Sequence, residues 1–212
     1  MRIAVVYDCL YPYTIGGAER WYRNIAQRLA ARHHVTFITR RQWARGTPID
    51  APPGTEVVVV SGGKNLYTTS GRRRISIPLR FGWGVLVHLL ANRTKYDAVH
   101  TCGFPYFSLL AARAARKLGG PPVVADWFEI WGRDYWNSYL GGIGGALGNA
   151  VERTCVRATE DAFVFSRLGA ERLRAAGYDA RPVVLGATYF LTCPESSSAP
   201  ASTNLRLTLA PT

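Results

Sequence analysis

The chain has 212 residues, of which 48% are hydrophobic, and its formal net charge is +12 at pH 7. This length suits one large domain or two small ones with a sizeable core, and no window reaches the roughly 18 apolar residues of a membrane-spanning helix. The charge is uneven, because residues 1–100 carry 15 Lys and Arg against 5 Asp and Glu. A basic first half favours an anionic partner such as a phosphate, a nucleic acid or an acidic lipid surface, or else serves solubility alone.

The first predicted unit is a strand, a glycine pair and a helix. Residues 2–7 form a short apolar run that is typical of a buried parallel strand. A loop from Asp8 leads to Gly16 and Gly17, after which apolar residues recur every three or four positions as far as Ala30. Glycines at the start of a helix let a ligand approach the backbone, and the free N–H groups there favour an anion such as a diphosphate. On this local pattern, a simple turn explains the glycine pair equally well.

Strands and helices alternate through most of the remaining chain. Further strands are predicted at residues 35–39, 56–60, 97–101, 122–126, 161–165 and 182–186. Helices are predicted at residues 78–92, 104–118, about 143–158 and 166–176. The alternation predicts right-handed crossovers and an α/β fold: a Rossmann-like, doubly wound, mainly parallel sheet of about seven strands with helices on both faces.

Two segments are predicted to lie outside this pattern. Residues 61–76 read as a long loop that holds Lys64 and the arginine triplet 72–74, for which a solvated loop is the simplest interpretation. Ser, Thr, Ala and Pro dominate residues 189–212, which indicates a disordered tail. We therefore expect a single folded domain over residues 1–188.

Ligands of an open parallel sheet bind beyond the carboxyl ends of its strands. His100 and Cys102 lie there, two residues apart on the same side of one predicted strand. A histidine at this place serves either as an acid, base or sugar hydrogen-bonding group, or as a packed core side chain. A cysteine is more often a small core residue than a nucleophile. Ser166 follows another strand and most simply caps the helix that it begins.

An aromatic segment follows the predicted strand at 122–126. Asp126, Trp127 and Glu129 open a run in which aromatic rings alternate with carboxylates as far as Trp136. Aromatic faces stack on sugar rings and carboxylates accept hydrogen bonds from sugar hydroxyls, so the run is a candidate sugar site. The alternative is a hydrophobic flap over the core.

The sequence lacks the motifs that are typical of several other enzyme classes. The chain has no P-loop, HExxH or GxSxG motif, and the glycines of residues 142–148 do not have the spacing of a dinucleotide fingerprint. We expect those glycines to allow close helix packing. The four cysteines, at positions 9, 102, 155 and 193, show no metal-ligand or redox spacing. Reduced thiols in a cytoplasmic protein explain them most simply.

Four segments share a pattern with a known family: residues 1–7, 13–20, 97–101 and 163–166. Together they resemble the N-terminal half of a retaining glycosyltransferase of the GT-B fold, in the group 1 family (family four), over roughly residues 1–188. The resemblance implies transfer of a sugar from a nucleotide-sugar donor to a glycan or lipid-linked acceptor, without a metal or other cofactor.

The resemblance also assigns roles to individual residues. Gly16 and Gly17 would lie against the donor diphosphate, and His100 matches the first histidine of a His-x-His motif at a strand end. Cys102 stands where relatives carry the second histidine, which contacts the donor sugar. The acceptor side would include a further set of residues, Asp126, Trp127, Glu129 and Ser166.

The family's donor-binding half has no counterpart after Tyr189. We therefore expect a missing C-terminal domain or a partner chain, and a chain that is incomplete alone. The expected location is the cytoplasm, at the inner face of the membrane, with an anionic lipid surface rather than nucleic acid as partner. The alternative is a non-catalytic nucleotide- or nucleic-acid-binding Rossmann-like module, whose binding to polynucleotides would depend steeply on salt.

Overall fold

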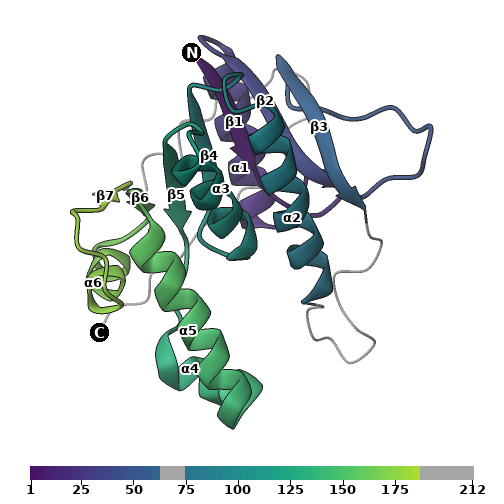
Figure 1. The fold of residues 1–212 in the computed structure, drawn as a ribbon. Coiled ribbons are helices and arrows are strands. Elements are labelled where there is room, and N and C mark those ends of the chain that lie inside the picture. Colours follow the sequence, from purple (N-terminus) through teal and green to yellow (C-terminus); the bar gives the residue numbers. More distant parts are fainter. Residues whose placement is uncertain (63–74, 187–212) are drawn as a thin grey trace, which may run out of the picture.

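The computed structural model describes residues 1–62 and 75–186 (Figure 1). The predicted arginine-bearing loop around residues 72–74 and the predicted disordered tail at 189–212 lie outside the described residues.

The described strands form one sheet in which every pair is parallel, in the order β3-β2-β1-β4-β5-β6-β7. The strands are β1 (Arg2–Val6), β2 (His34–Arg41), β3 (Thr55–Gly62), β4 (Ala98–Cys102), β5 (Val123–Trp127), β6 (Asp161–Val164) and β7 (Val183–Val184). The helices are α1 (Gly17–Ala30), α2 (Ser76–Ala91), α3 (Phe107–Lys117), α4 (Gly132–Leu140), α5 (Gly142–Ala158) and α6 (Arg167–Ala175). The predicted α/β class and parallel sheet are confirmed.

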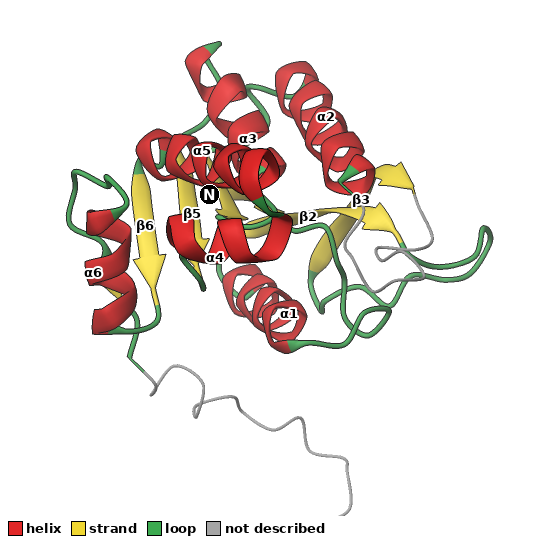
Figure 2. Cartoon of the chain, turned by 90° about the horizontal axis from the view of Figure 1, so that it is seen from below, coloured by secondary structure: helices red, strands yellow, loops and turns green. Residues whose placement is uncertain are grey.

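Helices cover both faces of the sheet (Figure 2). α1 lies on one face, whereas α2, α3 and α5 lie on the other. Side chains of β1 alternate between the two layers, as a strand of period two requires. Ile3 and Val5 join the cluster under α1, whereas Ala4 and Val6 join the larger cluster under α2, α3 and α5.

Two helix predictions need correction. α3 begins at Phe107 rather than at residue 104, because Pro105 disfavours the helical conformation of the residue before it. α4 occupies residues 132–140, within an aromatic segment for which the sequence analysis predicts no helix. The signal was present, since Trp131, Tyr135 and Tyr139 recur at intervals of four residues, which is helical spacing.

α4 and α5 form a hairpin that extends past the carboxyl ends of the strands (Figure 1). The glycines of α5 bring the two helices close together. A Cβ atom at Gly145 would lie 2.6 Å from the Cα of Asn137, and one at Gly148 would lie 2.7 Å from the Cδ2 of Trp136. The prediction that glycines allow close packing is therefore confirmed for Gly145 and Gly148, whereas a Cβ atom at Gly142 would meet nothing within 4 Å.

Candidate functional site

The start of α1 has the two glycines in different surroundings. Gly16 is the N-cap residue, with an extended backbone that any residue adopts (φ −170°). A Cβ atom there would collide with the carboxylate of Glu19, but this group is the end of a flexible side chain that can swing away, so neither space nor conformation requires glycine at position 16. Gly17 is exposed, and a Cβ atom there would meet nothing within 4 Å. The side of α1 next to Gly17 is therefore open to a ligand.

A pocket of about 670 Å³ lies between α1 and the sheet, and we call it the α1 pocket. Gly17 and Trp21 line it from the helix, and His100 and Phe163 line it from the sheet. The structure thus places one of the two predicted diphosphate-binding glycines and the predicted catalytic histidine in the same cavity.

Asp126 holds the side chains of His100 and Trp21 together beneath this pocket. Nε2 of His100 lies 2.9 Å from Oδ1 of Asp126, and the indole Nε1–H of Trp21 donates to Oδ2 at 2.7 Å. Asp126 is completely buried, whereas His100 is 7% exposed. The carboxylate therefore lies within ion-pair distance of the imidazole, although this contact does not have the geometry of a hydrogen bond. The carboxylate has no exposed surface on which a sugar hydroxyl could bind.

Cys102 and Trp127 are both buried. Burial raises the pKa of the Cys102 thiol, and the neighbouring Asp126 carboxylate raises it further, so the thiol is protonated near neutral pH. Trp127 is 1% exposed, packs over Gly103 and donates its indole N–H to Oγ1 of Thr159 at 3.3 Å. Its ring faces are enclosed by the core rather than presented to a sugar.

Glu129 and Ser166 line a second pocket, of about 860 Å³, between α4, α5 and α6. We call it the arginine pocket, because Arg133, Arg153 and Arg172 also line it. Oε2 of Glu129 accepts the indole N–H of Trp131 at 2.7 Å. Oγ of Ser166 accepts the backbone N–H of Gly169 at 2.9 Å, which confirms that Ser166 caps α6.

The six predicted residues that have side chains thus fall into three groups. His100 and Asp126 form a pair beside the α1 pocket, and Glu129 and Ser166 share the arginine pocket. Cys102 and Trp127 belong to the core.

The sequence comparison that decides the family is the match to the model of the glycosyl transferase 4-like domain, which extends over residues 16–187. The chain belongs to this glycosyltransferase family. It is therefore a transferase domain, and its N-terminal GT-B architecture agrees with that assignment.

Solved structures support the fold of this transferase domain. Sucrose-phosphate synthase from Thermosynechococcus elongatus matches it with a TM-score of 0.63 at 15% identity, over 87% of this chain and 47% of that chain. A second structure of that synthase matches with a TM-score of 0.57 at 16% identity, over 89% of this chain and 91% of that one. At these identities the likeness shows the fold alone. The search of curated proteins found no match.

The transferase domain also contains a buried carboxylate that the sequence analysis missed. Glu152 of α5 is 1% exposed and accepts hydrogen bonds from four donors. They are the hydroxyl of Tyr106 (3.0 Å), the backbone N–H groups of Trp131 (2.8 Å) and Gly132 (2.8 Å), and the indole N–H of Trp136 (3.2 Å). Glu152 lies three and four residues before Cys155 and Val156, on the same side of α5, and this helical spacing was the available signal. Glu152 fixes the start of α4 and hence the wall of the arginine pocket.

Within residues 1–62 and 75–186, no group of three or more His, Cys, Asp or Glu side chains is arranged to hold a metal ion. None of the helices in these two ranges combines the length and apolar character needed to cross a membrane.

Proposed function

We propose that the domain is the acceptor-side half of a retaining glycosyltransferase, which moves a sugar from a nucleotide-sugar donor to a glycan or lipid-linked acceptor. The observation that carries the proposal is the α1 pocket, where Gly17 at a helix start and His100 on a buried carboxylate share one cavity. The arginine pocket, with Glu129 and Ser166, would take the acceptor.

The residues have distinct roles in this proposal. The donor diphosphate approaches the start of α1 beside Gly17, where the helix dipole favours an anion. The carboxylate of Glu19, which lies over Gly16, must move aside or be neutralised when the diphosphate binds. His100, which lies beside Asp126, hydrogen-bonds a hydroxyl of the transferred sugar. Cys102 and Trp127 support the site from behind.

The proposed reaction balances without a cofactor. The bond between the anomeric carbon and the diphosphate oxygen breaks, and a bond from that carbon to an acceptor oxygen forms on the same face of the sugar. The acceptor proton passes to the departing diphosphate. No metal is required in this scheme.

A second half is part of the proposal. The chain spans 47% of the length of the first sucrose-phosphate synthase structure. We infer that a C-terminal domain or a partner chain supplies the remaining contacts to the nucleotide sugar. Transfer by the described half alone is not expected.

The proposed setting is the cytoplasmic face of an anionic membrane. The support is α2, whose outer side exposes apolar residues at intervals of four: Ile75, Leu79, Trp83 and Val87. Residues 75–96 contain no acidic side chain, and Arg80 is exposed among the apolar ones. An exposed apolar stripe of this kind marks an interaction surface, and the lack of acidic side chains agrees with an anionic bilayer as the partner.

The test is a transfer assay with the chain alone and with a donor-side domain supplied. Nucleotide sugars and glycan or lipid-linked acceptors are mixed, release of nucleoside diphosphate is measured, and NMR assigns the anomeric configuration of the product. We expect transfer with retention only when the second half is present, and a loss of at least tenfold in kcat for His100→Ala. His34→Ala, at an exposed histidine, is the control.

Full activity of His100→Ala would contradict the catalytic role. Tight, steeply salt-dependent binding of the chain to polynucleotides, without transfer, would favour the non-catalytic module instead.

A further inference from the structure

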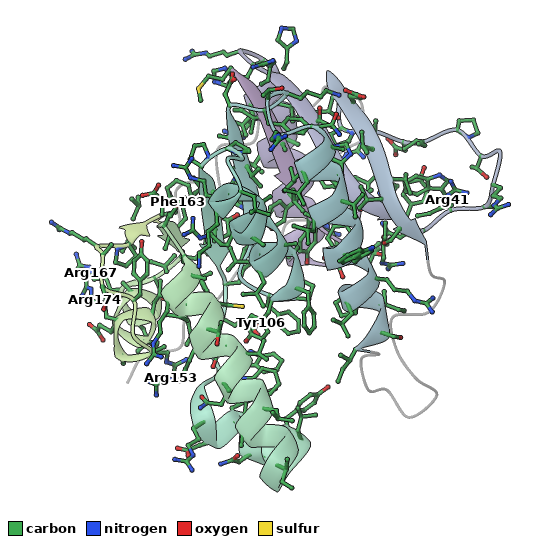
Figure 3. All side chains as sticks on the ribbon, viewed as in Figure 1. Arg41, Tyr106, Arg153, Phe163, Arg167 and Arg174 are labelled. Carbon is green, nitrogen blue, oxygen red and sulfur yellow. The ribbon has the colours of Figure 1, made fainter. Side chains whose placement is uncertain are left out.

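Three arginine side chains gather at the arginine pocket from three different helices. Arg133 comes from the first turn of α4, Arg153 from α5 and Arg172 from α6. All three residues are exposed, and Figure 3 shows Arg153 on the side of α5 that faces α6. Three separate elements thus place guanidinium groups around a single cavity.

These guanidinium groups do not pair directly with the acids of the pocket. Within the described part of the chain, none of the three arginines takes part in an ion pair. The pocket also contains two carboxylates, which keep their negative charge but contact other donors, so the three arginines outnumber the acids by one. Glu152 is saturated by four donors, and Glu129 accepts the indole N–H of Trp131. The arginines therefore keep their donors for a ligand.

The helix starts at this pocket add little to its attraction for anions. Glu152 already accepts the first backbone N–H groups of α4, and Ser166 already accepts the N–H of Gly169 at the start of α6. The positive character of the pocket therefore comes from arginine side chains. Arginine presents a planar fork of N–H groups that matches phosphate and carboxylate oxygens two at a time.

The rest of the lining suits a ring or a hydroxyl-bearing group. Phe128, Ile130, Trp131 and Tyr135 supply apolar and aromatic surface, and Glu129 and Ser166 supply polar atoms. A volume of about 860 Å³ lies within the range of small-molecule sites, roughly 300–1,000 Å³. The combination fits a sugar or similar group that also carries an anion.

We propose that the acceptor of this transferase bears a phosphate ester or diphosphate, which Arg133, Arg153 and Arg172 bind while the hydroxyl-bearing part lies toward Glu129 and Ser166. This inference rests on the proposed function, because it names the substrate class of the acceptor pocket. The phosphate belongs either to a soluble sugar phosphate or to a lipid-linked sugar, and the experiment separates these two sources.

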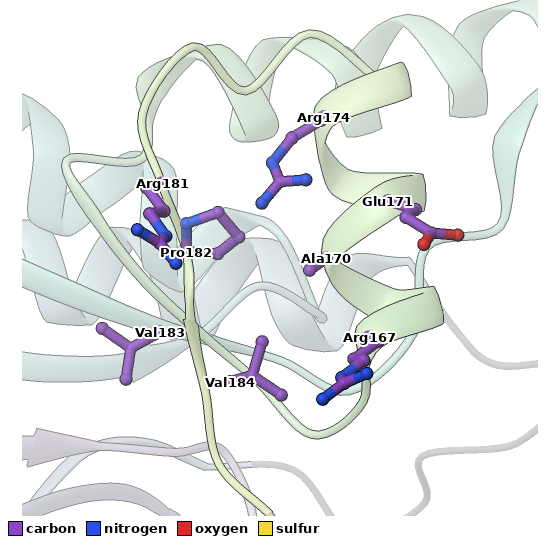
Figure 4. Close-up of a pocket in the computed structure, with 8 residues that line it drawn as sticks. All are labelled: Arg167, Ala170, Glu171, Arg174, Arg181, Pro182, Val183 and Val184. Atoms are coloured by element: carbon purple, nitrogen blue, oxygen red, sulfur yellow. The ribbon is translucent and has the colours of Figure 1, made fainter.

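A second arginine cluster offers a matched control. Arg167 and Arg174 of α6 and Arg181 before β7 line a separate pocket of about 500 Å³ beside Pro182, as Figure 4 shows. None of the predicted acceptor residues lines it. Arg172 and Arg174 are exposed arginines two positions apart on one helix, yet they line different pockets.

The experiment measures binding of four probes to the full 212-residue chain by calorimetry. The soluble pair is glucose 6-phosphate and glucose, and the lipid pair is a polyprenyl diphosphate sugar and the matching uncharged polyprenyl glycoside in detergent micelles. We expect the phosphorylated member of at least one pair to bind at least tenfold more tightly than its neutral partner. The pair that shows this preference identifies the source of the phosphate.

Variants then assign the binding to the arginine pocket. Arg172→Gln and Arg153→Gln should each weaken the phosphorylated probe about tenfold, and Arg172→Lys should restore it only in part, because lysine lacks the fork. Arg174→Gln should leave binding unchanged. Equal melting temperatures of all variants would show that the fold is retained.

Three results would overturn the inference: equal binding of phosphorylated and neutral probes in both pairs, no binding of any probe, or equal losses in Arg172→Gln and Arg174→Gln. The transfer assay keeps this failure apart from failure of the proposed function. If sugar is transferred to a neutral glycan at the same rate in Arg172→Gln as in the native chain, the phosphate-bearing acceptor is refuted and the transferase function stands. Binding of the phosphorylated probes without transfer to any acceptor would contradict the transferase function and leave the phosphate site in place.

Discussion

At the scale of single residues, Glu152 is the polar centre of the α4–α5 hairpin. Its carboxylate is buried, and it accepts two backbone N–H groups, an indole N–H and a phenolic O–H. A buried carboxylate is costly unless it is fully hydrogen-bonded, and each donor left without it would be costly in turn. The same residue therefore stabilises the hairpin and shapes the wall of the arginine pocket.

We predict that Glu152→Ala lowers the free energy of unfolding by about 3 kcal/mol or more, because it leaves several buried donors without an acceptor. Urea denaturation followed by tryptophan fluorescence measures the loss. Glu152→Gln should lie between Ala and the native chain, since the amide oxygen still accepts. Glu171→Gln, at an exposed acid of α6, is the control and should change stability by less than about 0.5 kcal/mol. Native-like stability of Glu152→Ala would contradict the role given to this carboxylate.

The pair formed by His100 and Asp126 marks a limit of sequence analysis. Both residues were predicted at neighbouring strand ends, but their contact depends on the register of β4 against β5, which places His100 opposite Val124 and Cys102 opposite Asp126. Register is set by the packing of the whole sheet rather than by either strand alone. The cap at Ser166 was predictable, because it depends only on residues three positions apart.

At the scale of elements, the apolar runs that form the strands were predicted because each is short, continuous and bounded by turn residues. α4 was not predicted, because its aromatic and acidic side chains also fit a ligand site, and this pattern obscures their four-residue spacing. The close contact of α4 and α5 was predictable from the glycines of α5. The side chains that pack against these glycines were not predictable. A glycine leaves space beside the helix, but the side chain that fills this space is decided by the packing of the whole fold.

We predict that Gly148→Ala destabilises the chain by about 1–3 kcal/mol, because the added methyl group would overlap the Trp136 ring. Gly142→Ala is the matched control in the same helix. A Cβ atom there meets nothing within 4 Å, and alanine favours helix over glycine, so stability should stay equal or rise by up to about 1 kcal/mol. Thermal unfolding of both variants tests the pair. Equal effects of the two substitutions would show that α5 does not depend on this close approach.

α2 is apolar on two opposite sides. The inner residues Ile77, Phe81, Val85 and Leu89 are buried against the sheet and α3, and the outer residues Ile75, Leu79, Trp83 and Val87 are 48–68% exposed. A helix that is apolar all round is normally buried on all sides, so the outer stripe calls for a partner. The absence of acidic residues from 75 to 96 favours an anionic lipid surface.

We predict that Leu79→Ser combined with Trp83→Ser weakens binding to phosphatidylglycerol vesicles at least tenfold. Sedimentation with vesicles measures the partition, and neutral phosphatidylcholine vesicles should bind more weakly than anionic ones. Leu118→Ser, at an exposed apolar residue after α3, is the control. Added salt should weaken binding of the native chain only in part, because the apolar stripe is not screened. Unchanged partition of the double variant would exclude α2 as the lipid-binding element.

At the scale of the whole molecule, both candidate pockets flank a single sheet. The α1 pocket offers a donor one helix start and one imidazole, and the carboxylate of Glu19 already lies at that helix start. Small-molecule sites usually enclose roughly 70–90% of their ligand, which requires walls on more than one side. A nucleotide sugar at this surface would therefore be contacted from one side only.

We predict that the 212-residue chain alone binds nucleotide sugars with a Kd weaker than about 1 mM, because a ligand that is contacted from one side only keeps much of its surface in water. Saturation-transfer NMR with UDP-, GDP- and ADP-linked sugars measures the affinity. A donor-side domain of the same family, added as a separate chain, should supply the second wall and bring the Kd into the micromolar range. Micromolar binding by the chain alone would mean that the donor site is already complete within the sheet and helices described here, and the requirement for a second half would fall.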